Sequence, residues 1–373
     1  MKSLPVIDIS PLCSESGDDA ATAAVAASIR KACIEWGFFY IVGARPRHAA
    51  TLDALLRATV ALFDLPHDSK RALAASLSPL HRGWTGVGGA HNCSSSGRGG
   101  TGPDNKESFL LGAEGGASPM HGPNPWPSAD LLPGWEADMS AYFSSALAVS
   151  RALSRGLALA LGLDRAFFEQ RMRDPVAQLL LLRYPPAPPS DGGGGDGGSN
   201  SSAARRVVGC GEHTDCGFLT LLAQDDVPGL EVRPRAAGAA SAAAATANSG
   251  GGGGEGGGDD AGWVPAPPLP GALLVNLGDL AEFWSGGLFR STPHRVFAPG
   301  GADGRRARHS VVFFCNCDYD AEVAPLGAET GMGSDEAGER GAADAGNGCG
   351  VDGTSATTAG RYICEKLGLM FNE

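Results

Sequence analysis

A histidine and an aspartate stand one residue apart at the start of an apolar run in GEHTDCGFLTLL, residues 211–222. Side chains two positions apart in a β-strand point to the same side, so His213 and Asp215 could project together into a cavity. Imidazole nitrogens and carboxylate oxygens are common metal ligands. The pair alone is not specific, because a chain with 8 His and 41 acidic residues contains such a spacing by chance. A polar pair on a surface hairpin is therefore the alternative interpretation.

A third ligand is expected at His294, which follows Pro293 and opens the apolar segment HRVFAP. A mononuclear iron site of the facial type needs two imidazoles and one carboxylate, and it keeps its other positions open. Taken alone, His294 would be interpreted as a hydrogen-bonded core histidine. His309 alternates with Arg308 and Ser310 and should face away from them. The other histidines lie in loops or helices expected before the barrel, at His48, His67, His81, His91 and His121.

A second group of residues could bind a carboxylate. Arg308 and Ser310 share one face of the expected strand RHSVVFFCNCDYD. A guanidinium can bind both oxygens of a carboxylate, and Tyr184 in LLRYPP could add a phenol. A buried guanidinium without a partner is costly, so either an internal acid or a ligand carboxylate should face Arg308. Tyr184 could instead be a packed aromatic side chain.

The elements that would position these residues change in type along the chain. In the N-terminal half we expect helices at 18–36, 48–63, 135–161 and 165–172, and strands in LPVIDIS and GFFYIVG. From residue 177 the pattern becomes one of apolar strands, including VAQLLLLRYPP and GALLVNLGDL. GFLTLLAQDDVPGLEV is interpreted as a hairpin. Many short strands predict a barrel or a double-sheet jelly roll, and RYICEKLGLMF predicts a terminal helix.

Three low-complexity segments interrupt this pattern, at 187–204, 236–262 and 327–358. Their Gly, Ala, Ser and Asp residues cannot bury enough apolar area to offset the entropy of ordering them. We therefore expect disordered surface loops inserted within one fold.

The composition argues against several kinds of partner. The formal net charge is −12, and no cluster of Lys and Arg interleaves with aromatic residues, so we expect no nucleic-acid or membrane partner. We find no signal segment and no apolar run approaching ~18 residues. Nine cysteines without regular spacing argue against a disulfide framework; Cys315 and Cys317 are expected in the core. We therefore expect a cytoplasmic monomer that acts on a small molecule.

The order of the motifs resembles the iron(II)- and 2-oxoglutarate-dependent dioxygenases of the isopenicillin N synthase-like superfamily. RYPP, HTD, HRV and RHS follow one another as in that family, and LPVIDISPL, GFFYIVG and DNKESFLLG resemble its N-terminal region. The resemblance covers nearly the whole chain outside the glycine-rich segments. It implies a mostly β fold with flanking helices. A double-stranded β-helix (jelly-roll) core would occupy 177–326, after an N-terminal α/β region at 1–176 and before a low-complexity insertion with a C-terminal helix at 327–373.

The resemblance also implies roles for residues. His213, Asp215 and His294 match the family's iron ligands, and Arg308, Ser310 and Tyr184 match the residues that hold 2-oxoglutarate. The implied reaction uses iron(II), 2-oxoglutarate and dioxygen to hydroxylate or otherwise oxidise a small organic substrate. Leu182 stands where plant members often have Asn, which argues against flavonoid or gibberellin chemistry. Segments that border the pocket in the family contain Phe109, Leu111, Phe283 and Phe314, which could contact the substrate or equally pack in the core.

Two other functions are compatible with these motifs. An iron oxidase or cyclase that needs no 2-oxoglutarate, of the isopenicillin N synthase or aminocyclopropane carboxylate oxidase type, can also retain an Arg-x-Ser pair. A non-catalytic binding protein on the same scaffold is the third hypothesis, although such a protein would have no need of a complete set of iron ligands.

Overall fold

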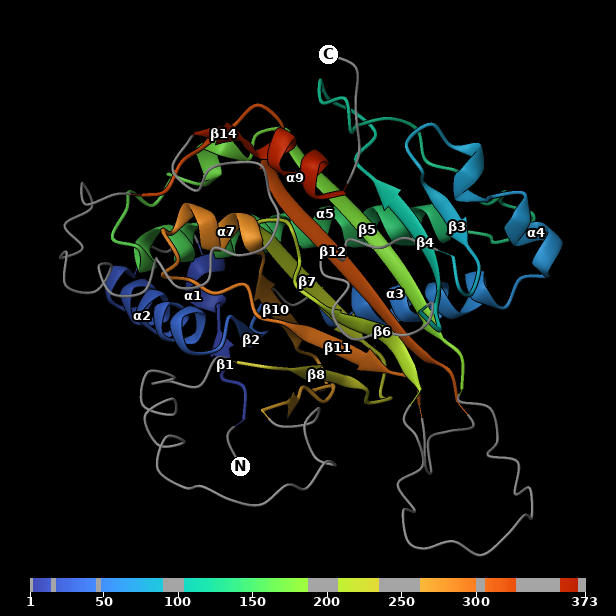
Figure 1. The fold of residues 1–373 in the computed structure, drawn as a ribbon, viewed down its shortest axis with the longest axis horizontal. Coiled ribbons are helices and arrows are strands. Elements are labelled where there is room, and N and C mark those ends of the chain that lie inside the picture. Colours follow the sequence, from blue (N-terminus) through green and yellow to red (C-terminus); the bar gives the residue numbers. More distant parts are fainter. Residues whose placement is uncertain are drawn as a thin grey trace, which may run out of the picture.

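The computed structural model describes residues 3–14, 18–44, 48–89, 104–186, 207–234, 262–299, 306–326 and 356–367 (Figure 1). The low-complexity segments lie outside the described residues except at their edges. The prediction that they are disordered therefore concerns residues that the structure does not describe. The end of the third segment is described, because Thr357–Thr358 form strand β14, which pairs with β13 (Glu322–Val323).

Two β-sheets form the centre of the fold. The larger sheet has the strand order β1-β2-β10-β7-β12-β5-β4-β3, and the smaller has the order β6-β11-β8-β9. The larger sheet consists of β1 (Val6–Asp8), β2 (Phe38–Val42), β3 (Gly83–Thr85), β4 (Glu107–Gly112), β5 (Pro175–Tyr184), β7 (Leu219–Gln224), β10 (Leu273–Leu277) and β12 (Arg308–Asp318). The smaller sheet consists of β6 (Val208–His213), β8 (Leu230–Val232), β9 (Val264–Pro265) and β11 (His294–Phe297). This arrangement of mainly antiparallel strands confirms the expected jelly-roll core.

Helices cover the outer face of the larger sheet: Figure 1 shows α3 and α5 behind its strands and α2 beside its β1–β2 edge, where α2 contacts α5. The helices are α1 (Ser10–Cys13), α2 (Asp19–Glu35), α3 (His48–Phe63), α4 (His67–Arg71), α5 (Trp135–Ala160), α7 (Asp279–Trp284) and α9 (Ala359–Leu367), with 3-10 turns at Ala75–Leu77 and Glu169–Arg171. The Asp18 carboxylate caps α2 by accepting a 3.0 Å hydrogen bond from the Ala21 N–H. The long helices therefore lie within a residue of where the sequence predicts them.

The helix expected at 165–172 is not formed. Only Glu169–Arg171 make a 3-10 turn there. The Asp164 carboxylate accepts the Ala166 N–H at 2.9 Å, which favours a turn over a helix. The Phe168 ring then packs edge-on against Trp284, 5.1 Å between centroids.

Side chains on the two faces of strand β5 pack into different cores, because the larger sheet lies between these cores. Leu179 and Leu181 pack in the core beneath the helices, whereas Leu180, Leu182 and Tyr184 pack in the core between the two sheets. Because both faces are buried, the strand reads as a continuous apolar run rather than an alternating one. The two cores share one sheet, which strands β1–β4 of the expected 1–176 region extend on both sides.

The hairpin expected in GFLTLLAQDDVPGLEV is wrong. Strand β7 pairs with β10 and β12 in the larger sheet, while β8 pairs with β11 and β9 in the smaller one. The intervening turn, in which the Asp225 carboxylate accepts the Val227 N–H at 3.0 Å, carries the chain from one sheet to the other. A strand-turn-strand pattern predicts the elements but not their pairing partners. Cys315 and Cys317, in contrast, are fully buried as expected.

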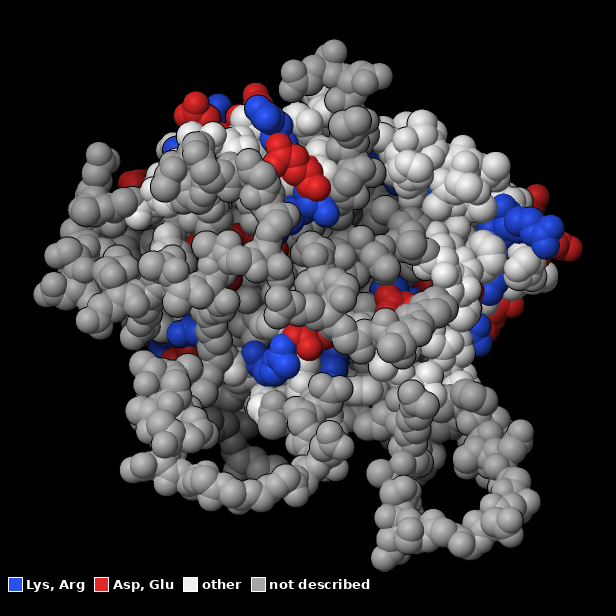
Figure 2. All heavy atoms as spheres, in the orientation of Figure 1, with Lys and Arg blue, Asp and Glu red and all other residues white. Residues whose placement is uncertain are grey.

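The face of the molecule seen in Figure 2 carries mixed charge among its described residues. Figure 2 shows acidic and basic side chains lying next to one another on this face rather than in separate patches. Within the described ranges, no helix has both the length and the apolar character needed to cross a membrane.

Candidate metal centre

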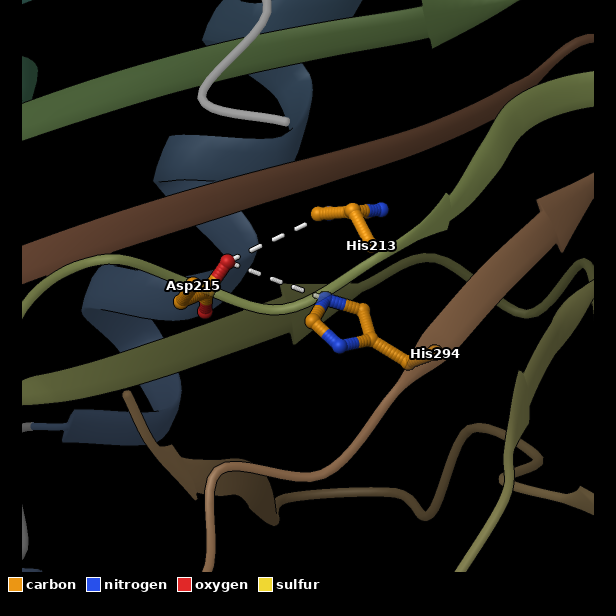
Figure 3. Close-up of side chains that lie close together, drawn as sticks. All are labelled: His213, Asp215 and His294. Carbon is orange, nitrogen blue, oxygen red and sulfur yellow. Dashed lines mark ion pairs between the residues drawn. The ribbon is translucent and has the colours of Figure 1, made fainter. Parts of the chain in front are cut away.

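His213, Asp215 and His294 come together between the two sheets (Figure 3). His213 ends β6 and His294 opens β11, and these two residues are direct partners in the antiparallel pairing of the strands. One ligand atom from each residue lies within 4.8 Å of the other two. Asp215 Oδ1 is 3.7 Å from His294 Nε2 and 4.0 Å from His213 Nε2. All three side chains are largely buried.

Asp215 reaches the site from a turn, so the expectation that it shares a strand face with His213 is wrong. Strand β6 ends at His213. The start of helix α7 holds this turn in place, because the N–H of its first residue, Asp279, donates to the Asp215 carbonyl at 2.7 Å. The side chain is fixed by two buried donors: Asn276 Nδ2 and Thr220 Oγ1 lie 2.6 Å and 2.7 Å from Asp215 Oδ2. The other oxygen, Oδ1, is the one nearest the two imidazoles.

Backbone carbonyls orient both imidazoles. His213 Nδ1 lies 2.8 Å from the Gly211 carbonyl oxygen, and His294 Nδ1 lies 3.1 Å from that of Thr292. A carbonyl only accepts, so in each ring Nδ1 carries a proton, and Nε2, the nitrogen nearer Asp215, is the one that binds a metal once it is deprotonated. Rings held in this way are the usual arrangement of histidine metal ligands.

Burial and close contact shift the pKa of each of the three groups in the metal-free protein. Burial and the neighbouring His213 lower the pKa of His294 to about 4, although Asp215 opposes this. Burial also disfavours the charged form of His213, but Cys210 and Asp215 outweigh it and raise that pKa to about 10, so a metal bound at Nε2 would have to displace a proton from this ring. Despite its burial, Asp215 has a lowered pKa because of the two imidazoles and its two hydrogen-bond donors. Two imidazole nitrogens and one carboxylate oxygen at this separation fit a divalent transition metal with open positions.

Arg308 lies in the same cavity with only neutral partners. It is fully buried, and its guanidinium donates to Gln224 Oε1 at 2.7 Å and to Ser310 Oγ at 3.3 Å. In the described part of the chain no carboxylate pairs with it, and its Nε has no hydrogen-bond partner. Its Cζ is 5.0 Å from the centre of the Tyr184 ring, whose pKa is raised by burial. A buried guanidinium with these neighbours is set to receive an anion.

One cavity connects the three-residue cluster with Arg308. Its polar lining consists of Lys106, Tyr184, Cys210, His213, Asp215, Thr220, Asn276, His294, Arg308 and Ser310. Its apolar lining consists of Phe38, Leu180, Leu182, Leu222, Leu230, Val296, Val312 and Phe314. A small ligand in this cavity can therefore contact the Arg308 end and the cluster at once.

Of the four hydrophobic residues considered for the pocket, only Phe314 lines it. Phe109 and Leu111 point to the opposite face of β4 and pack in the core beneath the helices. Phe283 stacks on Tyr362, with 5.9 Å between ring centroids. Of the two roles considered for these residues, substrate contact and core packing, the structure shows core packing for Phe109, Leu111 and Phe283.

Four polar residues near the site were not singled out from the sequence: Lys106, Thr220, Gln224 and Asn276. Thr220, Gln224 and Asn276 are polar residues within apolar strands, in LTLLAQ and LLVNL. A polar side chain in a strand that is otherwise buried must find a partner, and this was the signal that could have identified them.

Family comparisons agree over most of the chain. Residues 4–129 match the family described as non-haem dioxygenase in morphine synthesis N-terminal, and residues 176–316 match the 2OG-Fe(II) oxygenase superfamily. A homoarginine-6-hydroxylase of Glycine max is 32% identical over 340 residues, covering 87% of this chain and 88% of the relative. A 2-oxoglutarate-dependent dioxygenase of Penicillium crustosum is 29% identical, covering 86% of each chain.

Solved structures show the same architecture. A full-length protein of Neurospora crassa, crystallised in complex with alpha-KG (2-oxoglutarate), has a TM-score of 0.71 at 25% identity and covers 98% of this chain and 96% of its own. The dioxygenase for auxin oxidation from rice has a TM-score of 0.58 at 27% identity and covers 87% of each chain.

Proposed function

This chain belongs to the 2OG-Fe(II) oxygenase superfamily and is an iron(II)- and 2-oxoglutarate-dependent dioxygenase, and we propose that His213, Asp215 and His294 hold its iron. Each would contribute one atom, Nε2 from the imidazoles and Oδ1 from the carboxylate. Three ligands on one side leave the remaining positions open for the co-substrate and dioxygen.

We propose that Arg308, Ser310 and Tyr184 hold 2-oxoglutarate. The observation that carries this proposal is the buried Arg308 guanidinium, whose partners among the described residues are neutral. A dicarboxylate would place its distal carboxylate at Arg308 and Ser310, with its other end toward the iron ligands. The Tyr184 phenol would donate to the same carboxylate, and Gln224 would orient the guanidinium.

The protein's own part in the reaction is binding, orientation and the exclusion of water. Bound iron(II) supplies the activation of dioxygen that couples oxidative decarboxylation of 2-oxoglutarate to oxidation of the substrate. The Gly211 and Thr292 carbonyls hold the imidazoles in their metal-binding tautomers, and Asn276 and Thr220 hold the carboxylate. The apolar walls, including Leu182 and Phe314, limit access of water to the site.

The substrate is proposed to be a small organic molecule. The cavity lies between the two sheets and is lined by residues of both, and the Glycine max relative is named for hydroxylation of homoarginine, a small molecule. We also propose that the enzyme works in the cytoplasm, because none of the seven cysteines in the described ranges forms a disulfide, which suits a reducing compartment.

An anaerobic titration tests the site assignments. Iron(II) and then 2-oxoglutarate are added to the purified protein, and visible absorption is recorded. We expect a charge-transfer band for the wild type that is absent in Asp215→Ala and, at the same 2-oxoglutarate concentration, in Arg308→Met. An unchanged band in either variant would contradict the role proposed for that residue. A 2-oxoglutarate-independent oxidase would show no band even in the wild type.

A further inference from the structure

Lys106 is a second buried cation in the cavity, and the roles assigned so far leave it unused. It immediately precedes β4, and the pairing of Glu107 with Arg183 places it beside Tyr184 across the β4–β5 ladder. Neighbouring residues in a strand point to opposite faces. Glu107 accordingly pairs with Lys70, whereas Lys106 lines the cavity and is 7% exposed.

The Lys106 ammonium has more N–H donors than it has hydrogen-bond acceptors among the described residues. Its Nζ lies 2.9 Å from Asp104 Oδ2 and 3.1 Å from Cys210 Sγ, and these are its partners among the described residues. An ammonium has three N–H donors, and a thiol is a weak acceptor. Asp104 is itself fixed, because its Oδ1 accepts the Gly211 N–H at 3.1 Å. Asp104 thus holds the ammonium at the cavity wall without using all of its hydrogen-bonding capacity.

Lys106 lies near the iron ligands but apart from Arg308. The Cys210 thiol contacts both groups: its Sγ is 3.1 Å from Lys106 Nζ and 3.8 Å from His213 Nδ1, the ring nitrogen turned away from Asp215. Arg308 lies on β12 and Lys106 next to β4, on opposite sides of β5. Two strand spacings separate the backbones at these positions by about 10 Å. The cavity therefore has two cationic side chains at separate positions: Arg308, whose described partners are neutral, and Lys106, which is paired with Asp104.

We propose that Lys106 binds a carboxylate of the substrate, so that the enzyme selects organic acids. The inference rests on the function proposed above, in which one carboxylate of 2-oxoglutarate takes Arg308 and its other end faces the iron ligands. A substrate carboxylate at Lys106 would hold the rest of the molecule near the cluster, where the hydrogen to be removed must lie.

Matched acids and amides test this proposal. Wild type, Lys106→Met and Lys70→Met are loaded with iron(II) and 2-oxoglutarate. They are titrated anaerobically with L-homoarginine, phenylacetate and benzoate and with the corresponding primary amides, and binding is read from the visible band. Lys70 is the control, because it is an equally buried lysine paired with a carboxylate on the other face of β4. Loss of a charge-assisted hydrogen bond costs about tenfold to a hundredfold in affinity.

We expect the wild type and Lys70→Met to bind at least one acid about tenfold more tightly than its amide. Lys106→Met should bind both forms equally and keep its affinity for 2-oxoglutarate. A wild type that prefers no acid, or a Lys106→Met variant that keeps the preference, overturns the proposal. So does a Lys106→Met variant that loses 2-oxoglutarate affinity while keeping the preference. Failure of the function itself would be seen separately, as a wild type that gives no band with 2-oxoglutarate before any acid is added.

Discussion

The Asn276 side-chain amide donates a 2.6 Å hydrogen bond to Asp215 Oδ2, while Asp215 Oδ1 is the oxygen nearest the two imidazoles. Thr220 donates to the same Oδ2 at 2.7 Å, and Thr220 and Asn276 are direct partners in the β7–β10 pairing. The sheet itself therefore sets the rotation of the carboxylate. With Oδ2 occupied by two neutral donors, Asp215 is expected to bind a metal through one oxygen.

Removing either donor should weaken metal binding. Asn276→Leu and Thr220→Val leave Asp215 Oδ2 short of a partner and let the carboxylate rotate, so we expect the affinity for cobalt(II) or iron(II) to fall about tenfold to a hundredfold. Anaerobic calorimetric titration of the metal measures this. Thr59→Val is the control, because the buried Thr59 hydroxyl bonds only within α3, to the Leu55 carbonyl at 2.8 Å. Metal affinities equal to that of the control would refute the positioning role.

Arg308 and Ser310 should control 2-oxoglutarate without controlling the metal. Arg308→Met removes the guanidinium, and we expect KM for 2-oxoglutarate to rise about a hundredfold or more. Ser310→Ala removes one neutral hydrogen bond, and a rise of about fivefold is expected. Arg308→Lys should restore only part of the loss, because an ammonium cannot bind a carboxylate through two parallel bonds.

These effects are measured as succinate formation over a range of 2-oxoglutarate concentrations, beside metal affinity for each variant. Ser154→Ala provides a control for Ser310, because Ser154 is a buried serine in α5 whose hydroxyl bonds the Arg151 carbonyl. If Arg308→Met changed metal affinity and KM together, the separation of the two subsites would be wrong.

The sequence predicts which side chains meet in the cavity better than it predicts which parts of the backbone hold them there. His294 opens a strand as expected, and Arg308 and Ser310 line the same cavity while His309 does not. Asp215, however, lies in a turn whose position depends on β10, more than 50 residues away in sequence. Periodicity reports which side chains share a face within one segment, but it holds no information on which distant backbone fixes a turn.

The same limit explains the errors in the fold. The hairpin expected through Asp225 fails because β7 and β8 each find partners from later in the chain. Phe109 and Phe314 both belong to strands of the larger sheet, yet they face different cores. In a sheet that is buried on both faces, apolar residues occupy both sides, so hydrophobic alternation no longer distinguishes the cavity from the helix layer.

Metal-free protein should lose stability as the pH falls from 6.5 to 4. The folded pKa of His294 is about 4, against 6.5 in the unfolded chain, because the ring is buried and lies beside His213. In this interval the unfolded chain binds a proton that the folded protein does not, so the free energy of unfolding decreases as the pH falls. The full effect is at most about 3 kcal/mol.

Urea unfolding of chelator-treated protein across this interval measures the effect. His294→Gln should lose much of the pH dependence, whereas His67→Gln, which changes a largely exposed side chain on α4, should keep it. Parallel pH profiles for wild type and His294→Gln would show that His294 is not the group responsible.

Glu107 should stabilise the fold without affecting the metal centre. Its buried carboxylate accepts hydrogen bonds from Lys70 Nζ at 2.9 Å, Trp84 Nε1 at 2.9 Å and Arg183 Nη1 at 2.7 Å. Glu107→Ala leaves the buried Lys70 ammonium without its counter-charge, so we expect the free energy of unfolding to fall by about 3–5 kcal/mol. Urea unfolding of the metal-free protein at neutral pH measures it.

An exposed ion pair supplies the comparison for Glu107. Asp226 accepts from Arg306 at 2.6 Å and 3.0 Å, but both side chains are more than half exposed. Asp226→Ala should therefore cost less than about 1 kcal/mol. Since Glu107 points away from the cavity, Glu107→Ala should bind iron(II) as tightly as the wild type once folded. Equal losses of stability in the two variants would mean that burial of the Glu107 network does not determine its contribution.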